Sequence, residues 1–359
     1  MDNQNPTNFD LDESILDLVF EAIEEDFTKG RKQNINPRLA LIVGQPGAGK
    51  STILTKIVDE FGAENLPVVV DMDELRLYHP FNAAIFKAHP FLYDDITGRA
   101  AGKWNAKLLE LARDKKFETI YQTTLAKRFF AEKIIREFGG QGYDVSLHCL
   151  AVPSKLSILG IYDRFEHDFQ TNNVPRWVDI PYHDMAYVEF PVNAQAFETE
   201  LPLSRVAAYR RDGTVVYENK RAAYAWGKKP RVQTVIEKDR SKPWSQRLKN
   251  EHVAKWTDVV ARYVRRFTGM SEEFVLRVVE SKEFLKEATL FASAIPAKKG
   301  EAVPNGVDTT TTHHHVFIQR DGDGKLIAFD RSPVAAPTVP VSSAKGAVPV
   351  AASSPKGPV

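Results

Sequence analysis

Short apolar runs alternate with longer amphipathic segments along the first half of the chain. The apolar runs predict strands at 39–43, 67–71, 119–124 and 145–152. Apolar residues that recur every three or four positions predict helices at 11–29, 51–61, 99–115, 126–138 and 156–168. Strands that alternate with helices favour an α/β fold, in which helices flank a parallel sheet.

The pattern changes after Pro175. Residues 205–217 predict a β-hairpin, because Arg-Asp-Gly lies between two β-forming runs. Segments 246–267 and 271–292 predict helices, and segments 316–319 and 326–329 predict a last hairpin. From Pro333 the chain is rich in Pro, Ala, Val and Ser, which favours a disordered tail.

A complete phosphate-binding loop, Gly-Gln-Pro-Gly-Ala-Gly-Lys-Ser, lies between the first predicted strand and an amphipathic helix. Its glycines let successive N–H groups face one anion, and the helix adds its positive N-terminal end. Lys50 can reach the β- and γ-phosphates, and the Ser51 hydroxyl can bind Mg²⁺. The expected nucleotide-binding residues are Gly44, Gln45, Pro46, Gly47, Ala48, Gly49, Lys50, Ser51 and Thr52. The expected fold is therefore of the P-loop NTPase type.

The charge balance limits the partners that we expect. With 48 basic and 47 acidic residues the net charge is +1, so we expect no large nucleic-acid interface. No apolar run approaches the roughly 20 residues of a membrane span, so we expect no membrane partner. The polar, acidic N-terminus does not resemble a secretory signal. The single cysteine, Cys149, lies in an apolar run and is expected to be a buried thiol.

Two acids, Asp71 and Asp73, follow the second predicted strand. This is the edge at which parallel α/β sheets bind ligands. One carboxylate here can accept the proton of an attacking hydroxyl, and another can help to hold Mg²⁺. The alternative is that both acids only cap the helix that follows.

Arg164 and Arg176 are candidates for the cations that phosphate-loop kinases place over the γ-phosphate. Arginine suits this role because it is always charged and forks onto phosphate oxygens. Taken alone, each of these arginines is more typical of a surface position.

Together these motifs resemble the zeta toxin family of bacterial kinases. The resemblance is carried by GQPGAGKS, VVVDMDELRLYHP, LAVP, LGIYDRFE, a second arginine and the pair His183-Asp184, over about 39–217. It implies transfer of the γ-phosphate of ATP to a sugar hydroxyl of UDP-N-acetylglucosamine, which blocks the synthesis of cell-wall precursors.

The resemblance also implies roles for individual residues. Ser51 matches the family's Mg²⁺ residue, and Asp73 matches its general base. The expected catalytic residues are Lys50, Asp73, Arg164 and Arg176. The residues expected to bind the acceptor are Asp71, Arg76, His79 and Thr124.

Two departures from the family pattern leave the acceptor open. The third predicted strand ends in Gln122-Thr123-Thr124 where the family has Glu-Gly-Thr. The predicted helix at 99–115 offers Trp104, Asn105 and Ala106 nearest to the position of the family's substrate-binding glutamate. A polar site built for one set of hydroxyls discriminates strongly. A kinase of NAD or of another nucleotide, acting as an effector, is therefore a serious alternative. A polynucleotide kinase and a catalytically dead nucleotide-binding module are weaker ones.

The expected ligands are ATP or GTP, Mg²⁺ and a small nucleotide or nucleotide-sugar acceptor. The resemblance adds an antitoxin protein as a partner and implies the bacterial cytoplasm, with delivery into another cell as an alternative. We expect four regions: an N-terminal helix and linker at 1–38, a P-loop kinase domain at 39–220, a C-terminal extension at 221–332 and the tail at 333–359.

Overall fold

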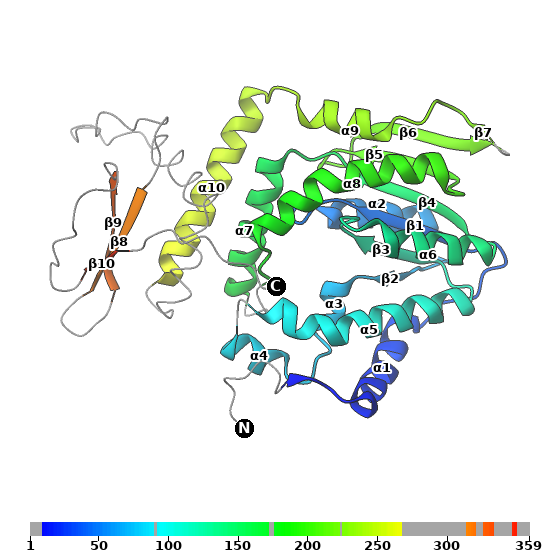
Figure 1. The fold of residues 1–359 in the computed structure, drawn as a ribbon, viewed down its shortest axis with the longest axis horizontal. Helices are drawn as coiled ribbons and strands as arrows, with labels where there is room; N and C mark the ends of the chain where they lie inside the picture. Colours follow the sequence, from blue (N-terminus) through cyan, green and yellow to red (C-terminus); the bar gives the residue numbers. More distant parts are fainter. Residues whose placement is uncertain are drawn as a thin grey trace. The chain divides into compact units, whose positions relative to one another are not determined.

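The computed structural model describes residues 9–89, 92–171, 176–222 and 225–267, and the backbone of three strands at 314–320, 326–333 and 347–349 (Figure 1). The chain divides into two compact units, Met1–Trp244 and Ser245–Val359. The first unit thus runs past residue 220, where the sequence pattern places the end of the kinase domain. It also includes the N-terminal helix.

The first unit is built on a seven-stranded sheet. In spatial order its strands are β2 (Val68–Val70), β3 (Thr119–Thr123), β1 (Arg38–Val43), β4 (Asp144–Leu150), β5 (Arg205–Tyr209), β6 (Val215–Ala222) and β7 (Ala225–Trp226). The strands from β2 to β5 are parallel, and β6 and β7 continue the sheet antiparallel. The predicted parallel sheet and the predicted hairpin between β5 and β6 are both confirmed.

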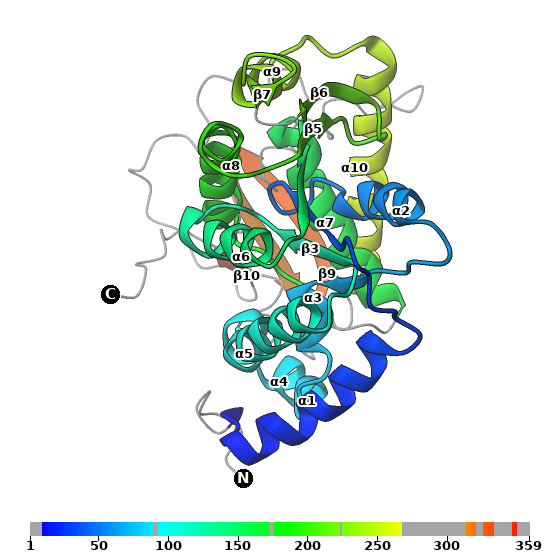
Figure 2. The same ribbon diagram turned by 90° about the vertical axis from the view of Figure 1, so that its right-hand side faces the viewer.

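Helices cover both faces of this sheet (Figure 2). One face packs against α1 (Glu13–Thr28), α5 (Tyr93–Asp114), α6 (Arg128–Gly140), α8 (Ile180–Glu200) and α9 (Val232–Arg240). The other face packs against α2 (Lys50–Phe61) and the start of α7 (Ser154–Gln170). The short helices α3 (Met72–Arg76) and α4 (Asn82–Ala88) follow β2.

The interior strand β1 shows why its position could be predicted from the sequence. Leu39, Leu41 and Val43 are buried in one apolar cluster, and Ala40 and Ile42 are buried in the other. A strand covered on both faces reads as a continuous apolar run, which is typical of parallel sheets. Cys149 of β4 lies in the first cluster, where burial raises the pKa of its thiol, so the predicted core thiol is confirmed.

The second unit contains α10 (Gln246–Phe267) and the antiparallel strands β8 (His314–Arg320), β9 (Leu326–Pro333) and β10 (Ala347–Pro349). The predicted helix at 246–267 and the predicted last hairpin are confirmed. The predicted helix at 271–292 lies outside the described residues, as does most of the predicted tail at 333–359. Within that tail, Ala347–Pro349 pair with β8.

Several helices of the first unit differ from the prediction, and among them α4 and α9 were not predicted. Helix α5 begins at Tyr93 rather than at residue 99. Helix α8 was not predicted, because Pro191 lies inside it and exposed apolar residues such as Val188 remove the polar face. None of the described helices combines the length and the apolar character needed to cross a membrane.

Candidate active site

The phosphate-binding loop connects β1 to α2. Gly47 and Gly49 have φ angles of 71° and 90°, in the left-handed region that favours glycine. A Cβ at Gly47 would lie 2.0 Å from the carbonyl oxygen of Ser157, and a Cβ at Gly160 would lie 2.3 Å from the carbonyl oxygen of Gly47. The loop and α7 therefore meet backbone to backbone, and only glycine fits at these two contacts.

Lys50 begins helix α2 and faces the acids of the site. Its ammonium group donates a hydrogen bond to the Gly44 carbonyl over 3.4 Å. Burial lowers the pKa of Lys50, and the charges of Asp71 and Asp73 oppose that shift. Ser51 is exposed on the first turn of α2. A partly buried cation, an exposed hydroxyl and a helix N-terminus together fit a bound phosphate chain.

Gln45 differs from the other residues of the loop, because its side chain turns into the protein. It is fully buried, and its amide donates to the Val152 carbonyl over 2.9 Å and to the Ser157 hydroxyl over 3.0 Å. A phosphate can therefore contact Gln45 only through the backbone.

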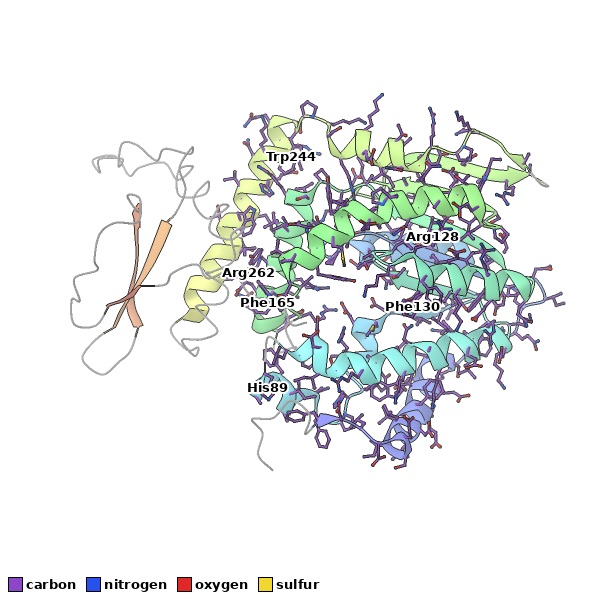
Figure 3. The ribbon with its side chains drawn as sticks, in the orientation of Figure 1. His89, Arg128, Phe130, Phe165, Trp244 and Arg262 are labelled. Carbon is purple, nitrogen blue, oxygen red and sulfur yellow. The ribbon has the colours of Figure 1, made fainter. Side chains whose placement is uncertain are left out.

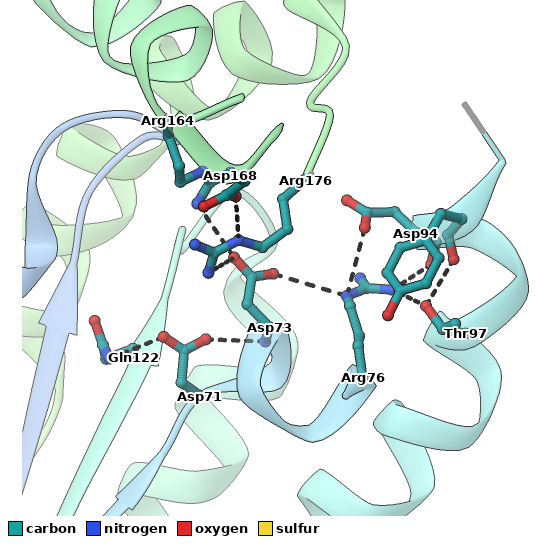
Figure 4. Close-up of polar contacts among 10 residues, drawn as sticks. Asp71, Asp73, Arg76, Asp94, Thr97, Gln122, Arg164, Asp168 and Arg176 are labelled. Carbon is teal, nitrogen blue, oxygen red and sulfur yellow. Dashed lines mark hydrogen bonds and ion pairs between the residues drawn. The ribbon is translucent and has the colours of Figure 1, made fainter. Parts of the chain in front are cut away.

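Asp73 lies at the centre of a cluster of arginines (Figure 4). Its Oδ2 is 3.3 Å from Nη1 of Arg164 and 3.8 Å from Nη1 of Arg176, and its Oδ1 is 3.7 Å from Nε of Arg76. Burial acts to raise the pKa of Asp73, but the three arginines and Lys50 outweigh it and lower the pKa below its usual value. Asp73 is therefore a carboxylate at neutral pH.

Aromatic packing holds the two arginine-bearing segments together. Phe165 of α7 (Figure 3), which follows Arg164, packs edge-on against Trp177, which follows Arg176, with ring centroids 5.1 Å apart. Arg176 is also paired through Nε with Oδ2 of Asp168 over 3.3 Å. Two guanidinium groups are thus held at one anion, and this arrangement equally suits a phosphoryl group.

Asp71 has a different role from Asp73. One of its oxygens caps α3 by accepting a hydrogen bond from the Asp73 N–H over 3.0 Å, and the other accepts from Nε2 of Gln122 over 2.9 Å. Burial, and then the nearby charge of Asp73, raises the pKa of Asp71. Gln122 therefore contributes an amide that fixes Asp71. Both oxygens of Asp71 have partners within the protein.

A second polar group lies around Arg76, at the start of α5. Arg76 donates to the Thr97 hydroxyl over 3.1 Å and to the backbone carbonyl of Asp94, and its Nε is 3.8 Å from Oδ1 of Asp94 (Figure 4). Burial raises the pKa of Asp94 to about 6. The Tyr93 hydroxyl is buried with no hydrogen-bond partner among the described residues, and burial raises its pKa to about 12, so it stays a donor.

Sequence reasoning missed Tyr93 and Asp94. The predicted helix began at residue 99, so both residues fell in a presumed loop. An available signal was the pair Asp94-Asp95, because acids are typical of the first turn of a helix.

Two predicted acceptor residues lie outside the arginine cluster. His79 is buried, accepts a hydrogen bond from the Phe81 N–H over 3.3 Å and packs near the ring of Trp104. Thr124 follows β3, and its hydroxyl is 2.9 Å from the hydroxyl of Tyr182 on α8. The structure brings together the predicted residues Lys50, Asp71, Asp73, Arg76, Arg164 and Arg176.

Arg211, in the turn between β5 and β6, was also missed. A Cβ added at Gly49 would lie 3.2 Å from Cγ of Arg211. Nη1 of Arg211 donates a hydrogen bond to the Leu156 carbonyl over 2.7 Å. Burial lowers the pKa of Arg211, and the charge of Asp163 opposes that shift. A partly buried guanidinium therefore lies beside the N-terminus of α2.

The fold and the site define an α/β protein of the P-loop kinase class. The zeta toxin family profile matches residues 22–222, which is more than half of the chain. The chain therefore belongs to the zeta toxin family, and the resemblance inferred from the motifs is confirmed. Membership supports a kinase-like, ATP-using function of the toxin class.

Individual relatives agree with this assignment. Toxin PezT of Streptococcus pneumoniae is 27% identical over 194 residues, which span 54% of this chain and 76% of the relative. Toxin zeta of Enterococcus hirae is 24% identical over 200 residues, 54% of this chain and 68% of the relative. A solved structure from the PezAT chromosomal toxin–antitoxin system of S. pneumoniae has a TM-score of 0.60 at 22% identity, and it covers 73% of this chain and 100% of that chain. The similarity to this solved structure supports the fold alone.

Proposed function

We propose that this protein transfers the γ-phosphate of ATP to a hydroxyl of a small nucleotide or nucleotide-sugar. The observation that carries the proposal is the convergence of Arg164 and Arg176 on Asp73, beside Lys50 of the phosphate-binding loop. Kinases of this class need a base for the acceptor and cations for the transferred group. GTP is the alternative donor.

In the proposed reaction the acceptor oxygen forms a bond to the γ-phosphorus. The bond between that phosphorus and the β–γ bridging oxygen breaks, and ADP leaves with its electron pair. Asp73 takes the proton of the acceptor hydroxyl. Lys50, Arg164 and Arg176 stabilise the charge that spreads over the phosphoryl oxygens.

Asp73 and the phosphoryl group compete for the same arginines. In the structure Arg164 and Arg176 pair with Asp73, whose pKa they lower. A carboxylate with a low pKa is a weak base. A bound γ-phosphate attracts the two arginines more strongly than a single carboxylate does, since it carries more negative charge. Their transfer to the phosphate then raises the pKa of Asp73 and makes it a better base.

The proposal assigns Mg²⁺ to the Ser51 hydroxyl. This hard oxygen donor is exposed on the first turn of α2, next to the phosphate-binding loop, and it fits the oxygen ligands that Mg²⁺ prefers. When bound, Mg²⁺ neutralises part of the phosphate charge.

The acceptor side suits a molecule rich in hydroxyls. Tyr93 offers a buried donor, Asp94 a buried acceptor and Arg76 further donors next to Asp73. UDP-N-acetylglucosamine is the first candidate, because it is the acceptor that the family resemblance implies. NAD is the second candidate. The Gln122 amide is bonded to Asp71 at a position where the resemblance implies an acid, and such a change in a polar site changes which hydroxyls it accepts.

The proposal includes toxicity and an antitoxin protein as the natural partner. A relative from the PezAT toxin–antitoxin system shares the fold. We expect expression in bacteria to arrest growth and the Asp73→Asn variant not to. Equal arrest by the variant would place the toxicity outside the proposed reaction.

The direct test is phosphate transfer from γ-labelled ATP with Mg²⁺ to UDP-N-acetylglucosamine, NAD and simple nucleosides, with products resolved by mass. Lys50→Ala is the inactive control. A phosphorylated UDP-sugar selects the first acceptor, and phosphorylated NAD selects the second. If the wild type binds ATP and phosphorylates no member of the panel, the proposed acceptor class is wrong.

A further inference from the structure

Helix α9 reaches the phosphate-binding loop from beyond the stretch that matches the family, which ends at residue 222. Nη2 of Arg240, the last residue of α9, donates a hydrogen bond to Oε1 of Gln45 over 2.8 Å. The amide nitrogen of Gln45 donates to the Val152 carbonyl and the Ser157 hydroxyl. Both ends of this loop side chain are thus held in the interior, and Arg240 holds the carbonyl end.

Arg240 is itself fixed from several sides. Its guanidinium carbon lies 3.9 Å from the ring centroid of Tyr187 and 4.6 Å from that of Phe190, and its Nη1 donates to the Tyr187 carbonyl over 2.9 Å. The residue is 8% exposed. Burial lowers its pKa to about 10, so the group remains charged at neutral pH. A planar guanidinium that packs against two rings and donates to a backbone carbonyl has little freedom to leave Gln45.

The chain of contacts continues from Gln45 into α7 and α8. The Ser157 hydroxyl lies 2.8 Å from Nε2 of His183, whose Nδ1 lies 2.9 Å from Oδ1 of Asp184. The pair His183-Asp184, part of the family resemblance, therefore supports the loop from within the protein. Ser157 also provides the carbonyl that excludes a side chain at Gly47.

Loss of the Arg240 contact would leave the buried Oε1 of Gln45 without a partner. An unpaired buried carbonyl is unfavourable, so the side chain would turn toward water and take the loop backbone with it. Phosphate binding depends on the direction of the loop N–H groups. A contact made far from the nucleotide can therefore change how well the nucleotide binds.

We propose that Arg240 is a positioning residue for the phosphate-binding loop, acting through the side chain of Gln45, and that α9 is required for tight ATP binding. The inference rests on the proposed function only in taking ATP as the ligand. It gives the segment after residue 222 a role within the kinase unit.

The test is calorimetric titration of the full-length chain with Mg²⁺ and a non-hydrolysable ATP analogue. Arg240→Met keeps the packing on the two rings, and Gln45→Ala removes the other partner. Lys238→Met removes an exposed cation of the same helix and is the matched control. We expect the Kd for the analogue to rise about tenfold in each of the first two variants and to stay unchanged in the control.

A double-mutant cycle separates positioning from general stability. If both residues act through one hydrogen bond, the Kd of the double variant for the analogue is no higher than the higher of the two single-variant values. In transfer assays the KM for ATP should rise while the KM for the acceptor stays constant. Arg240→Lys keeps the charge but lacks the two Nη atoms that contact Tyr187 and Gln45 separately. It replaces Arg240→Met in the cycle if that variant does not fold.

Three results would be decisive. An unchanged Kd in folded Arg240→Met, or fully additive effects in the cycle, would overturn the inference. A wild type that does not bind the analogue would instead contradict the proposed function.

Discussion

Arg164 donates a hydrogen bond to Asp73 over 3.3 Å, although 91 positions separate the two residues in sequence. Asp73 follows β2 and Arg164 lies on the helix that follows β4. The carboxyl ends of parallel strands share one edge of the sheet, and the contact forms there. The Asp73 carboxylate and the Arg164 guanidinium thus meet at the edge of the sheet where the phosphate-binding loop also lies.

Removing either arginine should reduce catalysis far more than binding. Arg164→Ala and Arg176→Ala each remove a cation that the proposed reaction uses in the transition state. We expect kcat to fall about 10³-fold, with the Kd for ATP changed by less than about tenfold. Single-turnover transfer and equilibrium titration measure the two quantities. A variant that loses affinity but keeps kcat would make that arginine a binding residue only.

Asp94 should make stability depend on pH. Its folded pKa of about 6 lies above the ordinary value of 3.8. The stability that comes from the protonated form is complete below pH 4 and is lost as pH rises through 6. Asp94→Asn cannot ionise. We expect the free energy of unfolding of the wild type, relative to Asp94→Asn, to fall by about 1–2 kcal/mol between pH 4 and pH 7. The estimate is reduced because the side chain is 30% exposed.

Denaturant titrations at several pH values check this prediction. Asp95→Asn, on the same helix turn at an exposed position, is the matched control. A constant difference between the wild type and Asp94→Asn across this range would show that Asp94 ionises normally in the folded protein.

A methyl group at Gly160 should disturb the phosphate-binding loop. A Cβ there would lie 2.3 Å from the Gly47 carbonyl oxygen and 3.0 Å from Nη2 of Arg211. We expect Gly160→Ala to reduce stability by about 1–3 kcal/mol and to weaken ATP binding. Thermal unfolding and titration measure both effects. Gly140→Ala, where the added carbon meets nothing within 4 Å, is the control and should bind ATP normally.

Arg211 should contribute to binding of the donor nucleotide. Its side chain packs against Gly49, beside the N-terminus of α2, where its guanidinium can add positive charge for a bound phosphate. We expect Arg211→Ala to raise the KM for ATP about tenfold and to leave the KM for the acceptor unchanged. Arg136→Ala, an exposed arginine of α6, is the control. An unchanged KM for ATP would assign Arg211 to packing alone.

The sequence predicted those parts of the site that depend on local pattern. The loop from Gly44 to Ser51 could be predicted, because its glycines, its lysine and the apolar segments on either side form one continuous motif. The positions of the strands could also be predicted, since strands such as β1 are apolar on both faces and appear as continuous apolar runs. Asp73 was found because it follows a predicted strand, and its role and that of Arg164 followed from the family motifs that contain them.

Other features depend on contacts between distant segments and leave no local pattern. Arg240 and Gln45 are 195 positions apart, and nothing near either residue indicates the other. Gln45 was expected to face the nucleotide because loops of this type bind phosphate, but its side chain is buried. Asp94 was missed because the predicted start of α5 fell too late.

The central claim is that Asp73 is the base of a phosphotransferase, and single-turnover transfer of labelled phosphate by Asp73→Asn tests it most directly. Asp71→Asn, which changes the neighbouring acid, is the comparison. We predict that Asp73→Asn binds ATP but transfers phosphate at least about 10²-fold more slowly than the wild type, and that Asp71→Asn loses less. Full transfer activity in Asp73→Asn would contradict the claim.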